Sequence, residues 1–136
     1  MTLEQVRESL NQSTFSNLVG FEIDRFEEGD VKLKLKVTEG LLNSNGSLHG
    51  GVHATMLDVV LGLTIRSLTK TQCTTITLNL NYLNPLTSDE VIATGKILRQ
   101  GYKNATAEGE LHDSNGILLA KATGTYKLIR DDKSMR

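Results

Sequence analysis

A single acidic residue stands inside the most apolar segment of the chain. Asp58 is the only carboxylate between Glu39 and Asp89, and its neighbours Leu57 and Val59 leave little polar surface around it. Burying a carboxylate is costly unless the group is paired, hydrogen-bonded or protonated. An acid kept under those conditions is typical of a cleft or a subunit interface where it does chemistry. Asp58 is therefore the first candidate functional residue.

A pair of glycines, Gly50 and Gly51, opens the segment that carries Asp58. Glycine is a poor helix former, so two glycines at the start of the longest predicted helix indicate a need for bare backbone there. Free N–H groups at a helix start, with the positive end of the helix dipole behind them, can stabilise a developing oxyanion. The alternative is that the pair only permits a tight turn or close packing, and both interpretations stand at this point.

The remaining reactive residue types predict no metal site. His49 and His53 are four residues apart, but the local sequence places no third ligand beside them. The single cysteine, Cys73, excludes an internal disulfide framework and a multi-cysteine metal centre. We expect no metal and no cofactor. His49 is more typical of a capping or hydrogen-bonded residue, and structural or surface roles are expected for His53, His112 and Cys73.

Two helices are predicted from hydrophobic periodicity. Thr2 and Gln5 have capping-box spacing, and the residues that follow predict a short amphipathic helix over residues 3 to about 17. Residues 50 to about 68 are apolar on every face and form too long a run for a buried strand. This second segment is predicted to be a helix with no exposed side.

Strands are predicted wherever apolar residues alternate with polar ones. A hairpin is expected around the turn Glu28-Gly29-Asp30, and residues 39–48 contain too many turn formers for regular structure. Four more runs follow the long helix, over residues 76–82, 90–100, 105–111 and 118–128.

The predicted architecture is α+β, with one curved antiparallel sheet wrapped around one long buried helix. Small residues on the inward face of the last strands would let the sheet approach that helix closely. These residues are Ala105, Ala107, Gly109, Ala120, Ala122 and Gly124.

Length and composition predict a single globular domain over residues 1–136 with a frayed tail at 130–136. Hydrophobic residues make up 38% of the 136 residues, charged residues make up 23%, and the formal net charge is −1. These values exclude a disordered chain, and the scattered basic residues argue against a nucleic-acid partner. The start of the chain has no apolar signal segment, and the most apolar stretch contains His53 and Asp58. We therefore expect no membrane partner and a cytoplasmic location.

The order of these residues resembles the hotdog-fold acyl-CoA thioesterases of the phenylacetic-acid-degradation type. The resemblance lies in Asn43, the run His49-Gly50-Gly51, Asp58 separated from that run by six residues, and a strand that ends Tyr82-Leu83-Asn84-Pro85. It covers nearly the whole chain, from about residue 15 to about residue 128.

This resemblance implies an enzyme that hydrolyses an acyl-CoA thioester. Backbone N–H groups at Gly50 and Gly51 would polarise the thioester carbonyl. Asp58 would act as nucleophile or general base, across a dimer interface, in a site partly built by the other subunit. The chemistry fits, since thioester hydrolysis needs an activated carbonyl and one carboxylate but no metal or redox cofactor.

Three further residues receive roles from the same resemblance. Asn43 would orient the thioester or the attacking water, and His49 would support the loop before the helix. Thr75 would supply a hydroxyl that positions water.

Alternatives from other classes remain open at this point. A non-catalytic acyl-CoA-binding or sensor protein would usually need an output module, and the first 17 residues are too short for a helix-turn-helix. A hotdog hydratase or dehydratase would use a different acid/base histidine arrangement, which the sequence does not match. Asp58 in an apolar helix favours the thioesterase.

The strand at residues 74–83 predicts how the protein assembles. We expect a homodimer with shared active sites, and two such dimers are expected to form a dimer of dimers. One face of this strand is predicted to be buried, with Ile76, Leu78, Leu80 and Tyr82. The other face carries Thr75, Thr77, Asn79 and Asn81. The strand has no charged side chain that would oppose pairing with another strand, so it is expected to pair antiparallel with the same strand of a second copy.

Overall fold

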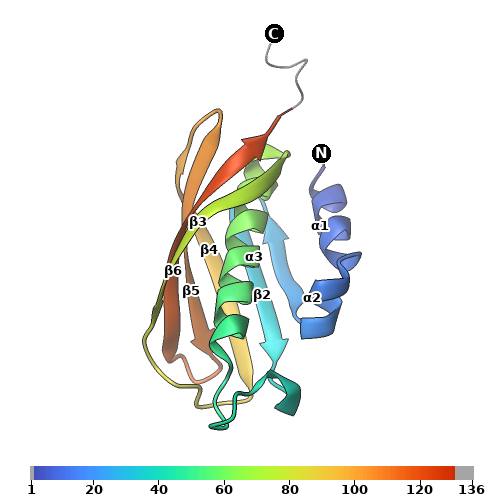
Figure 1. Cartoon of the computed structure of the whole chain (residues 1–136). Helices are drawn as coiled ribbons and strands as arrows, with labels where there is room; N and C mark the ends of the chain where they lie inside the picture. The colour runs from blue at the N-terminus through green and yellow to red at the C-terminus, as the bar shows by residue number, and fades with distance from the viewer. Residues whose placement is uncertain (1, 131–136) are drawn as a thin grey trace.

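Within residues 2–130, which the computed structural model describes, six antiparallel strands form one curved sheet around a long helix (Figure 1). The elements in chain order are α1 (Leu3–Asn11), α2 (Thr14–Val19), β1 (Glu22–Glu27), β2 (Asp30–Lys36), the 3₁₀ turn η1 (Glu39–Leu41), α3 (Gly50–Thr69), β3 (Gln72–Tyr82), β4 (Glu90–Gln100), β5 (Asn104–Asp113) and β6 (Leu118–Ile129). The predicted α+β architecture is confirmed.

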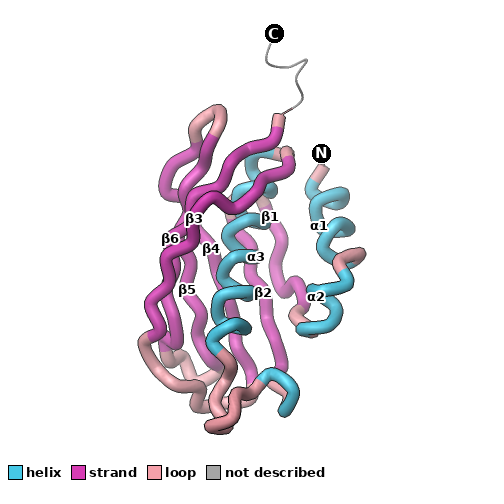
Figure 2. Tube along the Cα trace, viewed as in Figure 1, coloured by secondary structure: helices cyan, strands magenta, loops and turns pink. Residues whose placement is uncertain are grey.

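The strand order in the sheet is β1-β2-β4-β5-β6-β3. β3 follows α3 in the chain but pairs only with β6, so it forms an edge of the sheet, as β1 does at the opposite end. α1 packs against α3 and β1 beside the sheet (Figure 2). α3 contacts β2, β3, β4, β5 and β6 and is therefore the core helix. By length and composition it is also the one described helix long and apolar enough to cross a membrane.

The predicted helix over residues 3–17 is two helices. The capping box at Thr2 and Gln5 is present, but α1 ends at Asn11 and α2 starts after Ser13. The Ser13 side chain accepts a hydrogen bond from the N–H group of Ser16 and so caps a second helix start. Serine favours such local bonds over a helix interior, which explains the break.

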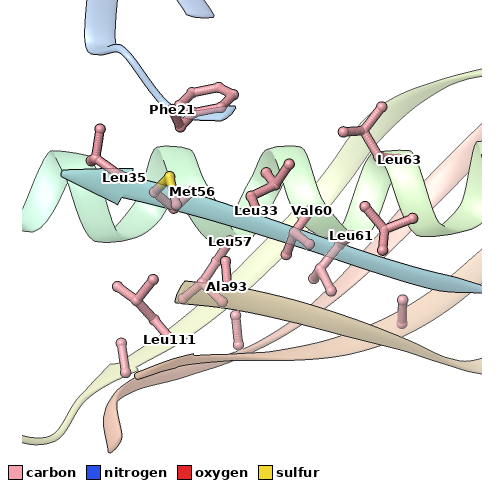
Figure 3. Packing of buried hydrophobic residues seen from close by; sticks show 14 of the residues in the cluster. Phe21, Leu33, Leu35, Met56, Leu57, Val60, Leu61, Leu63, Ala93 and Leu111 are labelled. Carbon is pink, nitrogen blue, oxygen red and sulfur yellow. The ribbon is translucent and has the colours of Figure 1, made fainter. Parts of the chain in front are cut away.

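The core lies between α3 and the inner face of the sheet. Met56, Leu57 and Leu61 of α3 belong to one buried cluster with Leu33 of β2 and Leu111 of β5 (Figure 3). Burying each such side chain contributes about 1.5 to 3 kcal/mol to the free energy of unfolding.

Glycines let α3 lie unusually close to the sheet. A Cβ atom at Gly109 would lie 2.9 Å from Cδ2 of Leu61, and one at Gly95 would lie 2.5 Å from Oγ1 of Thr64. The predicted small inward-facing residues of β5 and β6 are indeed buried, including Ala107. Gly95 on β4 belongs to the same set and was not predicted.

The prediction that α3 has no exposed side is wrong. Thr55, Asp58, Gly62 and Arg66 are only partly buried, and they recur at helical spacing along one strip. The sheet covers the other sides of the helix, and α1 covers this strip incompletely. The strip carries the one carboxylate of α3.

β3 departs from simple alternation at Ile76. Thr75 pairs with Tyr126 but Thr77 pairs with Thr125, so one extra residue is inserted in β3. Such a bulge leaves a residue unpaired and reverses the order of faces beyond it. The predicted burial of Ile76 is wrong, since its side chain is 53% exposed.

The bulge also places Thr75 on the same side as the partly buried Leu78 and Leu80, facing α3. The prediction that Thr75 lies on the opposite face is therefore wrong. Tyr82, predicted to be buried, is 58% exposed, although its hydroxyl reaches the start of α3.

The predicted frayed tail is only partly covered by the structure, because residues 131–136 lie outside the described chain. Arg130 is not frayed. Its Nε donates a 2.7 Å hydrogen bond to the carbonyl of Tyr102, and its guanidinium lies 4.3 Å from the centre of that ring.

Asp113 ties the end of β5 to the neighbouring loop. Its side chain is buried and accepts hydrogen bonds from Thr87, Asn115 and Ile117. Burial alone would raise the pKa of this carboxyl, but the hydrogen bonds outweigh burial and hold the pKa below its usual value.

We predict that Asp113→Asn lowers Tm and weakens the acid dependence of stability. The pKa of Asp113 is lower in the folded state than in the unfolded state, where it is about 3.9. The ionised carboxylate therefore stabilises the fold above the unfolded-state pKa, and this stabilisation is lost as the pH falls through the folded-state pKa. Thermal unfolding between pH 3 and 7 measures both effects. Exposed Asp89, mutated to Asn, is the matched control. Equal Tm values for Asp113→Asn and wild type across this range would contradict the assignment.

Candidate active site

The carboxylate of Asp58 is held on one side only. Its Oδ1 accepts hydrogen bonds from Oγ1 of Thr75 at 2.8 Å and from the hydroxyl of Tyr126 at 2.7 Å. The Tyr126 hydroxyl also lies 2.9 Å from the backbone carbonyl oxygen of Asp58. Within residues 2–130 no group donates to Oδ2. A carboxylate with one anchored and one open oxygen can act as a base or a nucleophile.

Asp58 lines a cavity of about 260 Å³ between the open strip of α3, the N-terminal helices and the β3–β6 edge. Ser9 and Leu10 border it from α1, Arg66 from α3 and Cys73 from β3. The mixed polar and apolar lining suits a ligand that carries both kinds of group.

The Cys73 thiol and the Tyr126 hydroxyl, both near Asp58, stay in their neutral forms near neutral pH. Burial raises the pKa of the Cys73 thiol to about 11, with Arg66 lowering it and Asp58 raising it by smaller amounts. Burial and the nearby Asp58 carboxylate also raise the pKa of Tyr126, so its hydroxyl remains a donor. Cys73 is thus a poor nucleophile, since only a thiolate attacks efficiently.

His49 caps the start of α3. Its Nδ1 accepts a 2.8 Å hydrogen bond from the N–H group of Gly51, and a Cβ atom at position 51 would lie 3.0 Å from this Nδ1. Close packing therefore accounts for Gly51, whose N–H group is occupied. The N–H group of Gly50 has no hydrogen-bond partner in the described part of the chain, so it is the donor left for a ligand.

Asn43 and His49 organise the loop before α3. Oδ1 of Asn43 accepts hydrogen bonds from the N–H groups of Asn45 and Ser47, and the N–H group of His49 donates to Leu41. The loop prediction for residues 39–48 is confirmed apart from η1 and a single bridge between Leu42 and Leu48.

A second cavity, of about 340 Å³, lies beside the helix start and includes Gly50, His53 and Tyr82. The Tyr82 hydroxyl donates to the carbonyl of Gly50 at 3.2 Å, and its ring centre lies 5.4 Å from that of His53. Burial lowers the pKa of His53, which keeps the imidazole neutral. His53 packs in the structure as a buried, uncharged side chain.

The predicted site residues form two separate groups in one chain. Thr75 lies at Asp58, whereas Asn43, His49, Gly50 and Gly51 lie at the start of α3. Gly50 and Asp58 are eight residues apart, which is about 12 Å along a helix. A donor and a carboxylate that both touch one carbonyl each lie within about 3 Å of it, so this separation favours a site in which the two groups come from different chains.

Tyr126 is the site residue that the sequence did not reveal. It was predicted only as one position in an alternating strand. Its aromatic ring at an inward position, two residues after Gly124, was the available signal.

A further cavity, of about 570 Å³, is lined by residues such as Tyr102, Lys127 and Arg130, and its lining contains neither a carboxylate nor a histidine. Among the described residues, no group of three or more His, Cys, Asp or Glu side chains is placed to hold a metal ion.

Comparison with known proteins defines the class. Residues 45–120 match the model of the thioesterase superfamily, and the chain belongs to that family. Its curved sheet and central helix are the hotdog fold of these proteins.

Individual relatives agree with this assignment. The medium/long-chain acyl-CoA thioesterase YigI of Escherichia coli is 33% identical, over 82% of this chain and 83% of its own. Zebra fish thioesterase superfamily member 2 matches with a TM-score of 0.83 at 28% identity, covering 95% of this chain and 99% of its own. A hypothetical thioesterase protein of Streptococcus pneumoniae, solved with coenzyme A, has a TM-score of 0.82 at 26% identity, covering 90% and 95%. These similarities support thioester hydrolysis in general terms.

We predict that His49→Ala destabilises the protein by about 1 kcal/mol, because it removes the cap from the Gly51 N–H group. His49→Asn, which keeps an acceptor at the cap, should recover most of this loss. Urea unfolding of both variants measures the difference. Equal losses for alanine and asparagine would show that the hydrogen bond to Gly51 contributes nothing.

Proposed function

We propose that this chain hydrolyses acyl-CoA thioesters to the free acid and CoA, with Asp58 as nucleophile or general base. The observation that carries the proposal is the Asp58 carboxylate, anchored at Oδ1 and open at Oδ2, inside a cavity of a thioesterase-superfamily fold. The CoA-bound relative and the acyl-CoA thioesterase relative support CoA thioesters as the substrate class.

The open oxygen of Asp58 serves either route. As a base, Oδ2 takes a proton from water while the water oxygen bonds to the carbonyl carbon, and the C–S bond then breaks as the proton passes to the thiolate. As a nucleophile, Oδ2 bonds to that carbon and expels the thiolate, and water then hydrolyses the mixed anhydride. Both routes place negative charge on the carbonyl oxygen, which the unpaired Gly50 N–H group would stabilise. Asn43 would help to orient the substrate or the water.

We further propose that two copies share each site. A second copy is needed because Gly50 and Asp58 of one chain stand too far apart to act on one carbonyl. β3 is the edge strand that would join the copies, since Gln72–Tyr82 contains no charged residue and no proline. The exposed side chains of Ile76 and Leu83 are apolar surface that such a contact would cover. Pairing of these dimers into a tetramer, and a cytoplasmic location, stay predictions.

A substrate panel identifies the acyl group. Both aryl and aliphatic acyl groups are candidates, and the Escherichia coli relative is named for medium and long acyl chains. A panel of aryl and aliphatic acyl-CoAs, with thiol release followed by a thiol-reactive dye, distinguishes the two.

On the best substrate of that panel, Asp58→Asn should reduce kcat by orders of magnitude while the fold is kept, because the amide is nearly isosteric but neither basic nor nucleophilic. The exposed Asp24, mutated to Asn, is the control for a general charge effect. A near wild-type rate for Asp58→Asn removes Asp58 from the mechanism. Tight binding of acyl-CoA by the wild type without turnover would instead indicate a non-catalytic binding protein.

The shared site predicts complementation between two inactive variants. Asp58→Asn removes the acid, and Gly50→Val adds bulk beside the N–H group and the Tyr82 ring, which is already 3.3 Å from a Cβ atom at this position. A mixed dimer has one intact site of two, so an equal mixture should recover about a quarter of the wild-type activity. Native mass spectrometry confirms subunit exchange. Exchange without recovered activity would overturn the shared site.

A further inference from the structure

We propose that Tyr126 is a positioning residue that, with Thr75, fixes Oδ1 of Asp58 and so makes Oδ2 the oxygen that reacts. This inference rests on the proposed thioesterase function and adds to it the orientation of the acid. It follows from a set of contacts that join β6, β3 and the middle of α3.

The Tyr126 hydroxyl contacts two oxygen atoms of Asp58. It lies 2.7 Å from Oδ1 and 2.9 Å from the backbone carbonyl oxygen of Asp58. The ionised carboxylate is the stronger acceptor of the two. Because one hydroxyl contacts both the side chain and the backbone of Asp58, rotation of the carboxylate away from this position breaks a charge-assisted hydrogen bond.

Two glycines leave the space that the Tyr126 ring occupies. A Cβ atom at Gly62, one turn after Asp58 on α3, would lie 3.6 Å from Cε2 of the ring. A Cβ atom at Gly124, on β6 itself, would lie 2.8 Å from Cε1, a distance that real contacts do not reach. The ring is only 2% exposed. The packing of the ring therefore fixes the position of its hydroxyl beside Asp58.

Thr75 completes the arrangement from β3. Its Oγ1 donates to the same Oδ1 at 2.8 Å, so the two donors together use the two lone pairs of that oxygen. The β3 bulge at Ile76 is what turns Thr75 toward α3. Because Oδ1 is occupied, Oδ2 is the oxygen that accepts the proton in the base route or bonds to the carbonyl carbon in the nucleophilic route.

The surroundings of Asp58 make this inference testable by pH. The charged and titratable groups that line its cavity are Arg66 of α3, Cys73 of β3 and Tyr126 of β6. The first two N-terminal helices contribute only serines and a leucine to it. Asp58 is the one carboxylate among the described residues that line this cavity.

The test compares Tyr126→Phe with wild type in kcat, KM and the pH profile. Phenylalanine keeps the ring in place and removes only the hydroxyl. Loss of a donor to the ionised carboxylate should move the acid limb of the pH–rate profile to higher pH. We expect kcat to fall about tenfold with little change in KM, because the carboxylate is misoriented in the bound complex.

Matched variants separate positioning from structural support. Thr75→Val should act in the same direction as Tyr126→Phe, and Thr75→Ser should restore the wild-type profile. Tyr102→Phe, which removes a phenol hydroxyl at the β4–β5 turn that does not line the Asp58 cavity, should leave the profile unchanged. A lower Tm for Tyr126→Phe with an unchanged profile and kcat would overturn the proposal.

A readout that needs no turnover keeps this test distinct from that of the proposed function. The carboxyl carbon of Asp58, followed by NMR, should titrate at higher pH in Tyr126→Phe than in wild type. An identical titration overturns the positioning role even in an active enzyme. Absence of acyl-CoA hydrolysis by the wild type overturns the proposed function and with it the assignment of Oδ2 as the reacting oxygen, whatever the titration shows.

Discussion

At two positions, Gly95 and Gly109, no side chain larger than hydrogen fits between α3 and the sheet. Cβ atoms at Gly95 and Gly109 would lie within 3 Å of atoms of α3. The helix can therefore lie almost on the backbone of β4 and β5, and the curved sheet bends around it. Because the helix is held so close, one turn in its middle can present Asp58 to hydroxyl groups of β3 and β6.

The same rigid helix sets the distance between the two groups of site residues. α3 begins at Gly50, where His49 occupies one backbone donor and leaves the other unpaired, and it reaches Asp58 about 12 Å further on. A helix held by a close-packed sheet does not bend to bring these residues together. The proposed shared site is the arrangement that would use both, and the uncharged edge strand β3 offers a surface for it.

Several features of the fold and the site could be predicted from the sequence because each depends on local residue types. Asp58 stood out because a carboxylate is rare in an apolar helix. The alternating runs predicted the six strands, and the glycine pair marked the start of α3. The capping box at Thr2 could also be predicted, because it needs only a spacing of three residues.

Other features depend on contacts across the fold, which local patterns do not contain. The bulge at Ile76 is a property of the pairing of β3 with β6, so strict alternation placed Thr75 on the wrong face. The open strip of α3 reflects how little of the helix α1 covers. Tyr126 looks like any inward strand residue until the packing of its ring between Gly62 and Gly124 brings its hydroxyl to Asp58.

The central claim is that Oδ2 of Asp58 and the Gly50 N–H group of a second copy act on one thioester carbonyl. A crystal structure with a dethia acyl-CoA analogue, in which a methylene group replaces the thioester sulfur, tests it most directly. The account predicts the carbonyl carbon about 3 to 3.5 Å from Oδ2 or one water away, and the carbonyl oxygen about 2.7 to 3.1 Å from that N–H group. A carbonyl bound elsewhere, such as the cavity beside Tyr102 and Lys127, or a carbonyl held by Gly50 and Asp58 of one chain, would contradict it.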